Sequence, residues 1–352
     1  MELDALLLSR QQFAFTLGFH ILFPTLTLGL APFLVLLEGL WLRSGKAVYV
    51  RLYRFWARLF GLAFGMGVVT GVVLSFEFGT NFGPFSQATG NVLGPLFAYE
   101  VLMAFFLEAG FLPVMLFGWG RVGARLHFLA TCMVTLGSIL SAFWILAASS
   151  WMHTPAGFAW VDGVFFPANW WRIVFNPSAP YRLAHMLTAS FLAGAFVVAG
   201  VSAWRLLRRE KEDTSRRAFA LAMGAAAVFS PLQIALGDLH GLQVQRDQPM
   251  KVAAMEALWE TRAGAPFVVF ALPDMDAATN RHALEIPRVA SLILKPDPDG
   301  VVLGLDQVAR EARPHVPTVF FAFRIMVGIG FFLFAVALAG LVLRLRGTLY
   351  SF

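Results

Sequence analysis

Charge and cysteine are scarce in this sequence. Charged residues make up 14% of its 352 residues, whereas 58% are hydrophobic, and a soluble domain of this length does not need so much apolar surface. The single cysteine, Cys132, excludes an internal disulfide and any metal or iron–sulfur site that is built from several cysteines. The composition therefore indicates a membrane protein.

Apolar runs of about 20 residues, the length that crosses a bilayer core, recur along the chain. They predict seven spans, at roughly 12–42, 53–79, 94–120, 125–150, 181–205, 216–238 and 317–344. Lipid offers no hydrogen-bond partners, so each span must be a helix. The expected fold class is all-α, a polytopic transmembrane helical bundle of about seven spans.

Basic residues are absent from the predicted connection between spans two and three, TNFGPFSQATGNVLGP. More than half of the 27 Lys and Arg residues lie instead in 43–58, 121–125, 205–217 and 344–346. The positive-inside rule puts these segments in the cytoplasm and the N-terminus outside. The net charge of +6 is then a topology signal, so the expected partner is the lipid bilayer and no nucleic acid.

The chain is expected to divide into five segments. A four-helix membrane bundle occupies 1–150, and an outward interfacial segment rich in Trp, Phe and Pro occupies 151–180. Helices five and six occupy 181–238. The largest polar region, an extracytoplasmic loop, occupies 239–316, and helix seven with a cytoplasmic tail occupies 317–352.

Two histidines, His20 in TLGFHILFP and His185 in YRLAHMLTASF, are flanked by apolar residues. Each could be a buried histidine that bonds to a neighbouring helix, or an axial ligand of a haem. Met326, in FFAFRIMVGIGFF, could complete a low-spin haem site with a histidine, and Arg324 beside it could pair with a haem propionate. Core packing of Met326 and snorkelling of Arg324 are the alternatives.

Glu100 and Glu108 lie inside one apolar span, in FAYEVLMAFFLEAGF. On an ideal helix they are about 12 Å apart along the axis and about 80° apart around it, so both could face one bundle interior. Intramembrane carboxylates usually serve proton relays or metal sites. Glu77, in SFEFGTNF, is expected nearer the outer surface and solvated.

Lys251 and Glu256, in GLQVQRDQPMKVAAMEALWETR, are five residues apart in the large polar loop. A solvated amphipathic loop helix explains them. A polar site for the head group of a lipid-soluble hydroxy-aromatic molecule is the functional alternative.

Together these motifs resemble subunit I of the cytochrome bd quinol oxidases. The resemblance runs through LLSRQQFAFTLGFHILFPTLTLG, FEFGTNF, LMAFFLE, AHMLTAS, KVAAMEALWET and FAFRIMVG, and covers nearly the whole chain. It implies a quinol:oxygen oxidoreductase in the cytoplasmic (inner) membrane of a bacterium or archaeon, with quinol oxidised outside and oxygen reduced to water.

The resemblance also implies residue roles. His185 and Met326 ligate a low-spin haem b, with Arg324 nearby, and His20 is the axial ligand of a high-spin haem b or haem d. Glu100 and Glu108 line the oxygen site and its proton path. Lys251 and Glu256 belong to the quinol-oxidising loop.

The resemblance is incomplete at the C-terminal end. The family chain continues for two more helices, with a GRQPW motif and a further haem-ligating glutamate, whereas this sequence ends at RLRGTLYSF. A second membrane subunit, of the subunit II type or a subunit I homologue, is therefore expected to supply the missing ligand, unless the haem set differs. The alternatives are a haem b electron-transfer or structural partner subunit and a proton-coupled transporter.

Overall fold

The computed structural model describes residues 5–210 and 212–350 and is 74% helical. Within these residues, seven helical stretches are long and apolar enough to cross a membrane, which confirms the predicted number of spans. They comprise α1 (Ala5–His20) with α2 (Leu22–Ser44), α3 (Ala47–Thr80), α4 (Gly83–Tyr99) continuing into α5 (Phe106–Phe117), α6 (Ala124–His153), α8 (Ala179–Leu207), α9 (Glu212–Asp247) and α12 (Val316–Leu345). The chain splits into two compact units, Met1–Phe229 and Ser230–Phe352.

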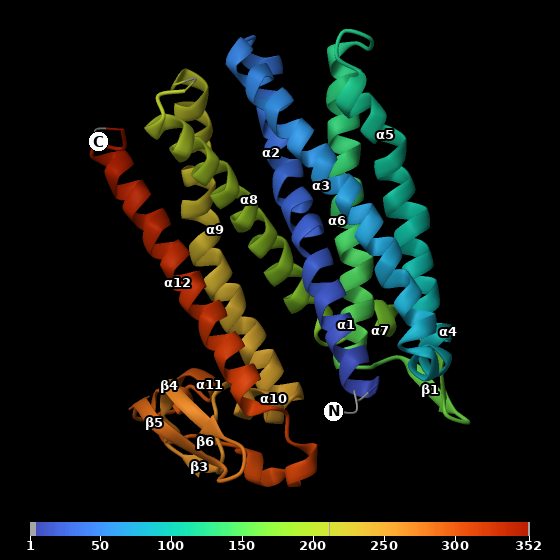
Figure 1. The fold of residues 1–352 in the computed structure, drawn as a ribbon, viewed down its shortest axis with the longest axis vertical. Coiled ribbons are helices and arrows are strands. Elements are labelled where there is room, and N and C mark those ends of the chain that lie inside the picture. The colour runs from blue at the N-terminus through green and yellow to red at the C-terminus, as the bar shows by residue number, and fades with distance from the viewer. Residues whose placement is uncertain (1–4, 211, 351–352) are drawn as a thin grey trace. The chain divides into compact units, whose positions relative to one another are not determined.

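In the first unit, α2 packs against α3, α6 and α8 (Figure 1). Leu30, Leu34 and Leu37 of α2 are fully buried against aromatic side chains of α3, including Trp56 and Phe60. Helices in lipid gain little from burying apolar surface, so close packing decides how they associate. This core fixes the positions of α2, α3 and α6, which carry the polar residues described below.

A close helix crossing in this unit joins Gly29 of α2 to Gly194 of α8. A Cβ added at Gly194 would lie 2.7 Å from the backbone carbon of Gly29, and one at Gly29 would lie 2.3 Å from the carbonyl oxygen of Ser190. Only glycine lets the two backbones approach this closely.

The third span begins earlier than predicted. Residues 83–93 were assigned to a connection, but α4 already starts at Gly83. Pro84 occupies the first turn of α4, where a missing N–H costs no hydrogen bond. Its presence, with the nearby glycines, made this helical segment resemble a loop.

The segment between α6 and α8 folds into a hairpin and a short helix. Strands β1 (Phe158–Val161) and β2 (Val164–Pro167) are antiparallel, and α7 spans Trp170–Val174. Asp162 and Gly163 form the turn with φ of 49° and 81°, values that a two-residue Asp–Gly hairpin turn requires.

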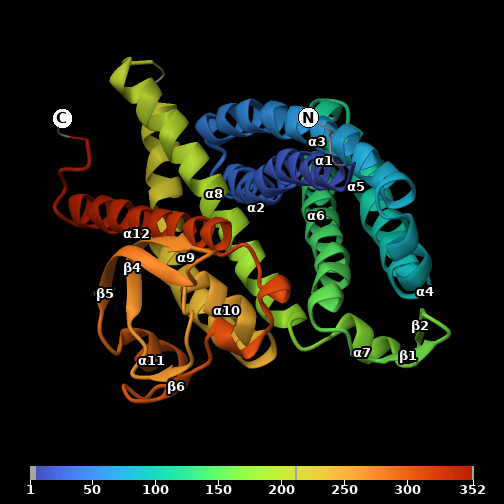
Figure 2. The same ribbon diagram turned by 60° about the horizontal axis from the view of Figure 1, so that its bottom comes forward.

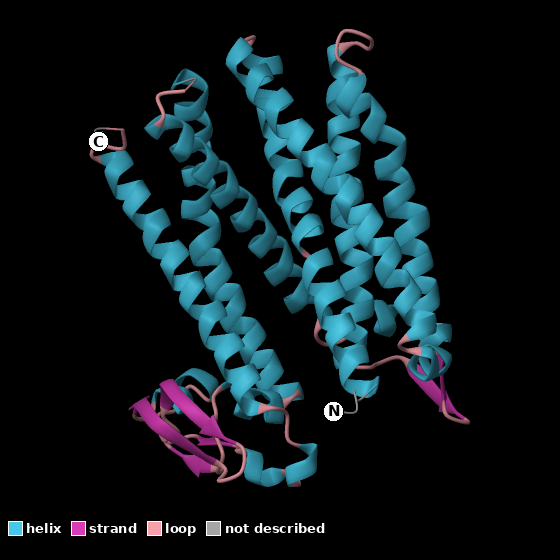
Figure 3. Cartoon of the chain, in the orientation of Figure 1, coloured by secondary structure: helices cyan, strands magenta, loops and turns pink. Residues whose placement is uncertain are grey.

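The second unit holds the large loop and α12 (Figure 2). Strands β4 (Phe267–Asp274) and β5 (Thr279–Ile286) form a hairpin, and β3 (Arg262–Ala263) pairs with β6 (Val301–Val302). The loop also contains α10 (Pro249–Met255), α11 (Val289–Leu294) and two 3₁₀ turns, Leu305–Gln307 and Arg310–Ala312. The all-α expectation missed these strands, which are short beside the long helices (Figure 3).

We expect Gly194→Ala to lower the free energy of unfolding by about 1–3 kcal/mol, the usual cost of an overpacked contact. Thermal unfolding of the purified protein in lipid or detergent measures the change. Gly200→Ala, on the same helix, is the matched control, because a Cβ there would meet no described atom within 4 Å. Because Gly→Ala by itself raises helix propensity, equal destabilisation by both variants would contradict the assignment of the effect to the crossing.

Candidate functional site

Both predicted intramembrane glutamates bond to hydroxyl groups of α6. Ser141 Oγ donates to Glu100 Oε1 at 2.7 Å, and Ser138 Oγ donates to Glu108 Oε1 at 2.5 Å. Glu108 is 6% exposed. Gly137 makes room for it, since a Cβ at that position would lie 2.4 Å from Glu108 Cγ. The structure therefore brings the two carboxylates to neighbouring turns of one helix.

A π-helical segment, Glu100–Phe105, lies between the two carboxylates. Such a segment accommodates one extra residue, so eight positions act like about seven and the angular separation falls from about 80° to about 20°. The ideal helix assumed from the sequence was wrong here. Because of the π-helical turn, Glu100 and Glu108 can face the same side of α6.

His20, the last residue of α1, bonds to α3. Thr70 Oγ1 donates to the backbone carbonyl oxygens of Met66 and Gly67, at 2.8 and 3.2 Å. Because this hydroxyl hydrogen is already donated, Thr70 Oγ1 accepts a hydrogen bond from Nδ1–H of His20 at 2.9 Å. This assigns the tautomer and leaves Nε2 as the nitrogen with a lone pair, which is what an axial haem ligand needs. The role of His20 as a haem ligand stays a prediction from the sequence.

The predicted low-spin ligands lie in different units. His185 is half-buried on α8, and Met326 is 52% exposed on α12. Their pairing at one iron stays a prediction from the sequence.

Arg324 has a partner that the sequence analysis did not predict. Its Nη2 lies 2.6 Å from Oε2 of Glu256, and both side chains are about nine-tenths buried. Arg324 Nε also donates to the carbonyl oxygen of Val268 at 2.7 Å, and the guanidinium lies over the rings of Phe267 and Phe320. The pair joins the end of α10 and strand β4 to the start of α12.

Lys251 lies in α10, one turn before Glu256. Both residues belong to the loop and not to a predicted span, as expected. Glu256 is 7% exposed, so the solvated loop helix considered for this pair is wrong for Glu256. The Glu256–Arg324 contact spans 68 positions, and a local sequence pattern cannot reveal it.

Glu77 was expected to be solvated, and this is wrong. It is 2% exposed on α3, and neither carboxylate oxygen has a hydrogen-bond partner among the described residues. A buried carboxylate is stable only when it is neutral or matched by another group.

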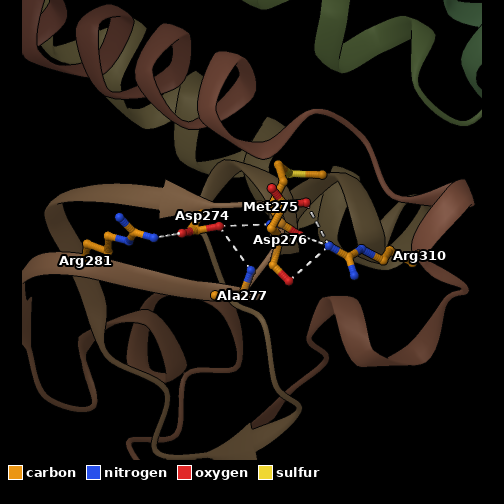
Figure 4. Close-up of polar contacts among 6 residues, drawn as sticks. All are labelled: Asp274, Met275, Asp276, Ala277, Arg281 and Arg310. Carbon is orange, nitrogen blue, oxygen red and sulfur yellow. Dashed lines mark hydrogen bonds and ion pairs between the residues drawn. The ribbon is translucent and has the colours of Figure 1, made fainter.

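The tip of the β4–β5 hairpin is fastened to the segment before α12 (Figure 4). Arg310 Nη2 donates to the carbonyl oxygens of Met275 and Asp276 at 3.1 and 2.9 Å. Asp274 Oδ1 accepts from the backbone N–H groups of Asp276 and Ala277, and Arg281 pairs with the same carboxylate. Strand β4, whose Val268 holds Arg324, is thereby anchored at both ends.

Known proteins resemble the chain over nearly its whole length. The family model for cytochrome bd terminal oxidase subunit I matches residues 8–352. Cytochrome bd-II ubiquinol oxidase subunit 1 of Escherichia coli (strain K12) is 39% identical over 89% of this chain and 62% of its own length. Cytochrome bd ubiquinol oxidase subunit 1 of Bacillus subtilis (strain 168) is 34% identical over 99% of this chain and 76% of its own length.

A solved structure shows the same fold. The bd oxidase from Geobacillus thermodenitrificans aligns with a TM-score of 0.88 and 33% identity, covering 96% of this chain and 78% of that chain. The chain thus spans about three fifths to three quarters of the length of the relatives it matches.

We expect the hairpin tip to loosen in acid. Backbone N–H groups of Ala277 and Asp276, and then Arg281, hold the pKa of Asp274 below its ordinary value of 3.8. A carboxyl group whose pKa is lowered by folding stabilises the fold above its unfolded-state pKa and stops doing so as pH falls through its folded-state pKa. Hydrogen-exchange protection of the Asp276 and Ala277 amides should therefore hold at neutral pH and fall below about pH 4.

Asp274→Ala should remove this protection at every pH, and Glu311→Ala, which removes an exposed acid elsewhere in the loop, should leave it intact. Protection that is independent of both pH and Asp274 would contradict the assignment.

Proposed function

Because the chain belongs to the cytochrome bd terminal oxidase subunit I family, as its motifs indicated, we propose that it is the haem-bearing subunit of a membrane quinol oxidase. The observation that carries the proposal is the buried Glu256–Arg324 pair. It connects the loop predicted to bind quinol with the helix of Met326, two positions from Arg324. An electron donor at Glu256 would thus meet the helix that carries a predicted haem ligand.

Three residues would hold the haem irons. His185 and Met326 would ligate a low-spin haem b, and His20, through Nε2, would ligate a high-spin haem b or haem d. These groups supply the one-electron and oxygen chemistry when bound.

The remaining residues handle substrate and protons. Lys251 and Glu256 hydrogen-bond the quinol hydroxyls, and the Glu256 carboxylate accepts a proton as quinol is oxidised. Arg324 holds that carboxylate in place and balances its charge. Glu100 and Glu108 hold the protons that the oxygen site consumes, with Ser141 and Ser138 fixing their orientation.

The proposed setting is the cytoplasmic membrane of a bacterium or archaeon. The connections of the first unit that carry basic residues, α2–α3, α5–α6 and α8–α9, lie at one end of that unit (Figure 1). The positive-inside rule assigns this end to the cytoplasm and the N-terminus to the outside. The protons consumed in the reduction of oxygen to water then enter from the cytoplasm, and the protons released by quinol oxidation leave on the outside. A second membrane subunit completes the proposed enzyme.

Haem binding provides the first test. We expect His185→Ala and Met326→Ala each to abolish the low-spin haem b band in the reduced-minus-oxidised spectrum of the purified complex, because each removes an axial ligand. Met152→Ala, which removes an exposed methionine at the end of α6, should leave the band unchanged. A low-spin band retained by both ligand variants would refute their assignment.

Quinol oxidation provides the second test. We expect Glu256→Gln to lower quinol-driven turnover by about 100-fold, the lower end of the range for a positioned proton acceptor. Chemically reduced enzyme should still react with oxygen.

Removing one partner of a buried ion pair costs about 3–5 kcal/mol, so stability needs its own control. The double variant Glu256→Gln with Arg324→Gln should regain stability but not quinol turnover. Equal loss of quinol-driven and chemically driven oxygen consumption in Glu256→Gln would argue against a quinol site.

A further inference from the structure

A buried acid–base pair in the first unit has no role in the proposed function. Glu38 of α2 and His127 of α6 are each 1% exposed, and His127 Nδ1 lies 2.6 Å from Glu38 Oε1. We propose that this pair binds and releases one proton, and that it supplies protons along α6 to Glu108 and Glu100. The supply of protons rests on the proposed function, whereas proton binding by the pair does not.

The hydrogen bonds around Glu38 fix the order of donors. Thr131 Oγ1 donates to Glu38 Oε2 at 2.6 Å, so the Tyr53 hydroxyl donates to Thr131 Oγ1 at 2.8 Å. His127 supplies Nδ1–H to the other carboxylate oxygen. Both oxygens of Glu38 therefore accept hydrogen bonds, an arrangement that stabilises the ionised carboxylate.

The other nitrogen of His127 is where a proton can bind. Nε2 is buried and has no hydrogen-bond partner among the described residues. With Nδ1 donating, Nε2 carries the lone pair, and its protonation turns a negatively charged pair into a neutral one.

The geometry suits this site to reversible proton binding. A proton on Nε2 would give an imidazolium at hydrogen-bond distance from the Glu38 carboxylate, while Nε2 itself has no hydrogen-bond partner among the described residues. No hydrogen bond at Nε2 therefore holds the ring in one protonation state.

The titratable and charged groups near the pair come from α3 and α6. Tyr53 of α3 and Cys132 of α6 interact electrostatically with Glu38. The Arg54 guanidinium lies 5.2 Å from the ring centre of Trp119, and that ring packs 4.2 Å from the imidazole of His127. Arg54 carries a permanent positive charge, and the ring of Trp119 lies between it and His127.

A polar face of α6 leads from the pair to the two glutamates. Positions 127, 131, 134, 138 and 141 recur at helical spacing and lie on one side of the helix. Thr131 bonds Glu38, Ser138 bonds Glu108 and Ser141 bonds Glu100. The face covers about 21 Å of helix axis. Val134 is its one apolar position, so a water molecule must carry the proton past it.

The pair lies toward the basic end of this face. His127 is in the first turn of α6, which also carries Arg125 and follows the connection that carries Arg121, and Glu38 is in the last two turns of α2. The α2–α3 and α5–α6 connections lie at the same end of the unit (Figure 1). A proton from the proposed cytoplasmic side therefore meets the pair before it meets Glu108.

Proton binding is tested by infrared spectroscopy on the purified complex carrying isotope-labelled histidine. The difference spectrum between acid and alkaline buffer should contain an imidazole band that is lost in His127→Gln and lost or shifted in Glu38→Gln. Glutamine keeps a hydrogen-bonding group but cannot bind the proton. Thr135→Val, which removes a hydroxyl of α6 that donates to the Thr131 carbonyl oxygen, should keep the band. Identical spectra for wild type and His127→Gln would overturn the proposal.

Proton supply is tested by quinol-driven oxygen consumption of the complex in vesicles. The pH is varied on the side of the membrane that faces the basic connections of the first unit. His127→Gln and Glu38→Gln should lower turnover by up to about 100-fold, and their deficit relative to wild type should widen as pH rises, because free protons become scarcer. A deficit that is the same at every pH, in variants with normal haem content and melting temperature, would reduce the pair to a structural contact. A wild-type complex that consumes no oxygen with quinol would refute the proposed function, while the infrared result would still decide whether the pair binds a proton.

Discussion

A polar side chain inside a lipid-spanning helix must find its partner within the protein, because hydrocarbon offers none. This constraint explains most of the side-chain geometry described here. Ser138 and Ser141 match the two glutamates of the third span, and Thr70 matches His20. Glu77 is the exception, because its buried carboxylate has no hydrogen-bond partner among the described residues.

The fold followed from the sequence wherever the signal was local. Seven spans could be counted because hydropathy accumulates over neighbouring residues. The start of the third span was misplaced because Pro84 and the adjacent glycines resemble a loop, although proline is suited to a first helical turn. The β4–β5 hairpin was missed because its strands lie in a segment whose polarity favoured a loop.

The candidate site depends even more than the fold on contacts between residues that are far apart in the sequence. Glu100, Glu108 and Arg324 could be singled out because a charge in an apolar run is conspicuous. Their partners could not be assigned. The serines were not singled out, and Glu256 was singled out in the loop but not as the partner of Arg324, because these pairings arise only from tertiary packing. The π-helical turn that aligns the two carboxylates has no signature in hydropathy. Glu38 was overlooked because it lies near the end of an apolar run, where an acid resembles a surface residue.

The placement of these partners along the chain has a consequence for biosynthesis. Glu38 belongs to the first span, and Glu100 and Glu108 belong to the third. The α6 groups that form hydrogen bonds with these three acids belong to the fourth span. A chain made from its N-terminus thus produces its intramembrane acids before it produces the helix that satisfies them. The first three spans must either enter lipid with these acids protonated or wait beside the insertion machinery until α6 emerges. Assembly of the first four spans is in this sense a single step, completed by α6.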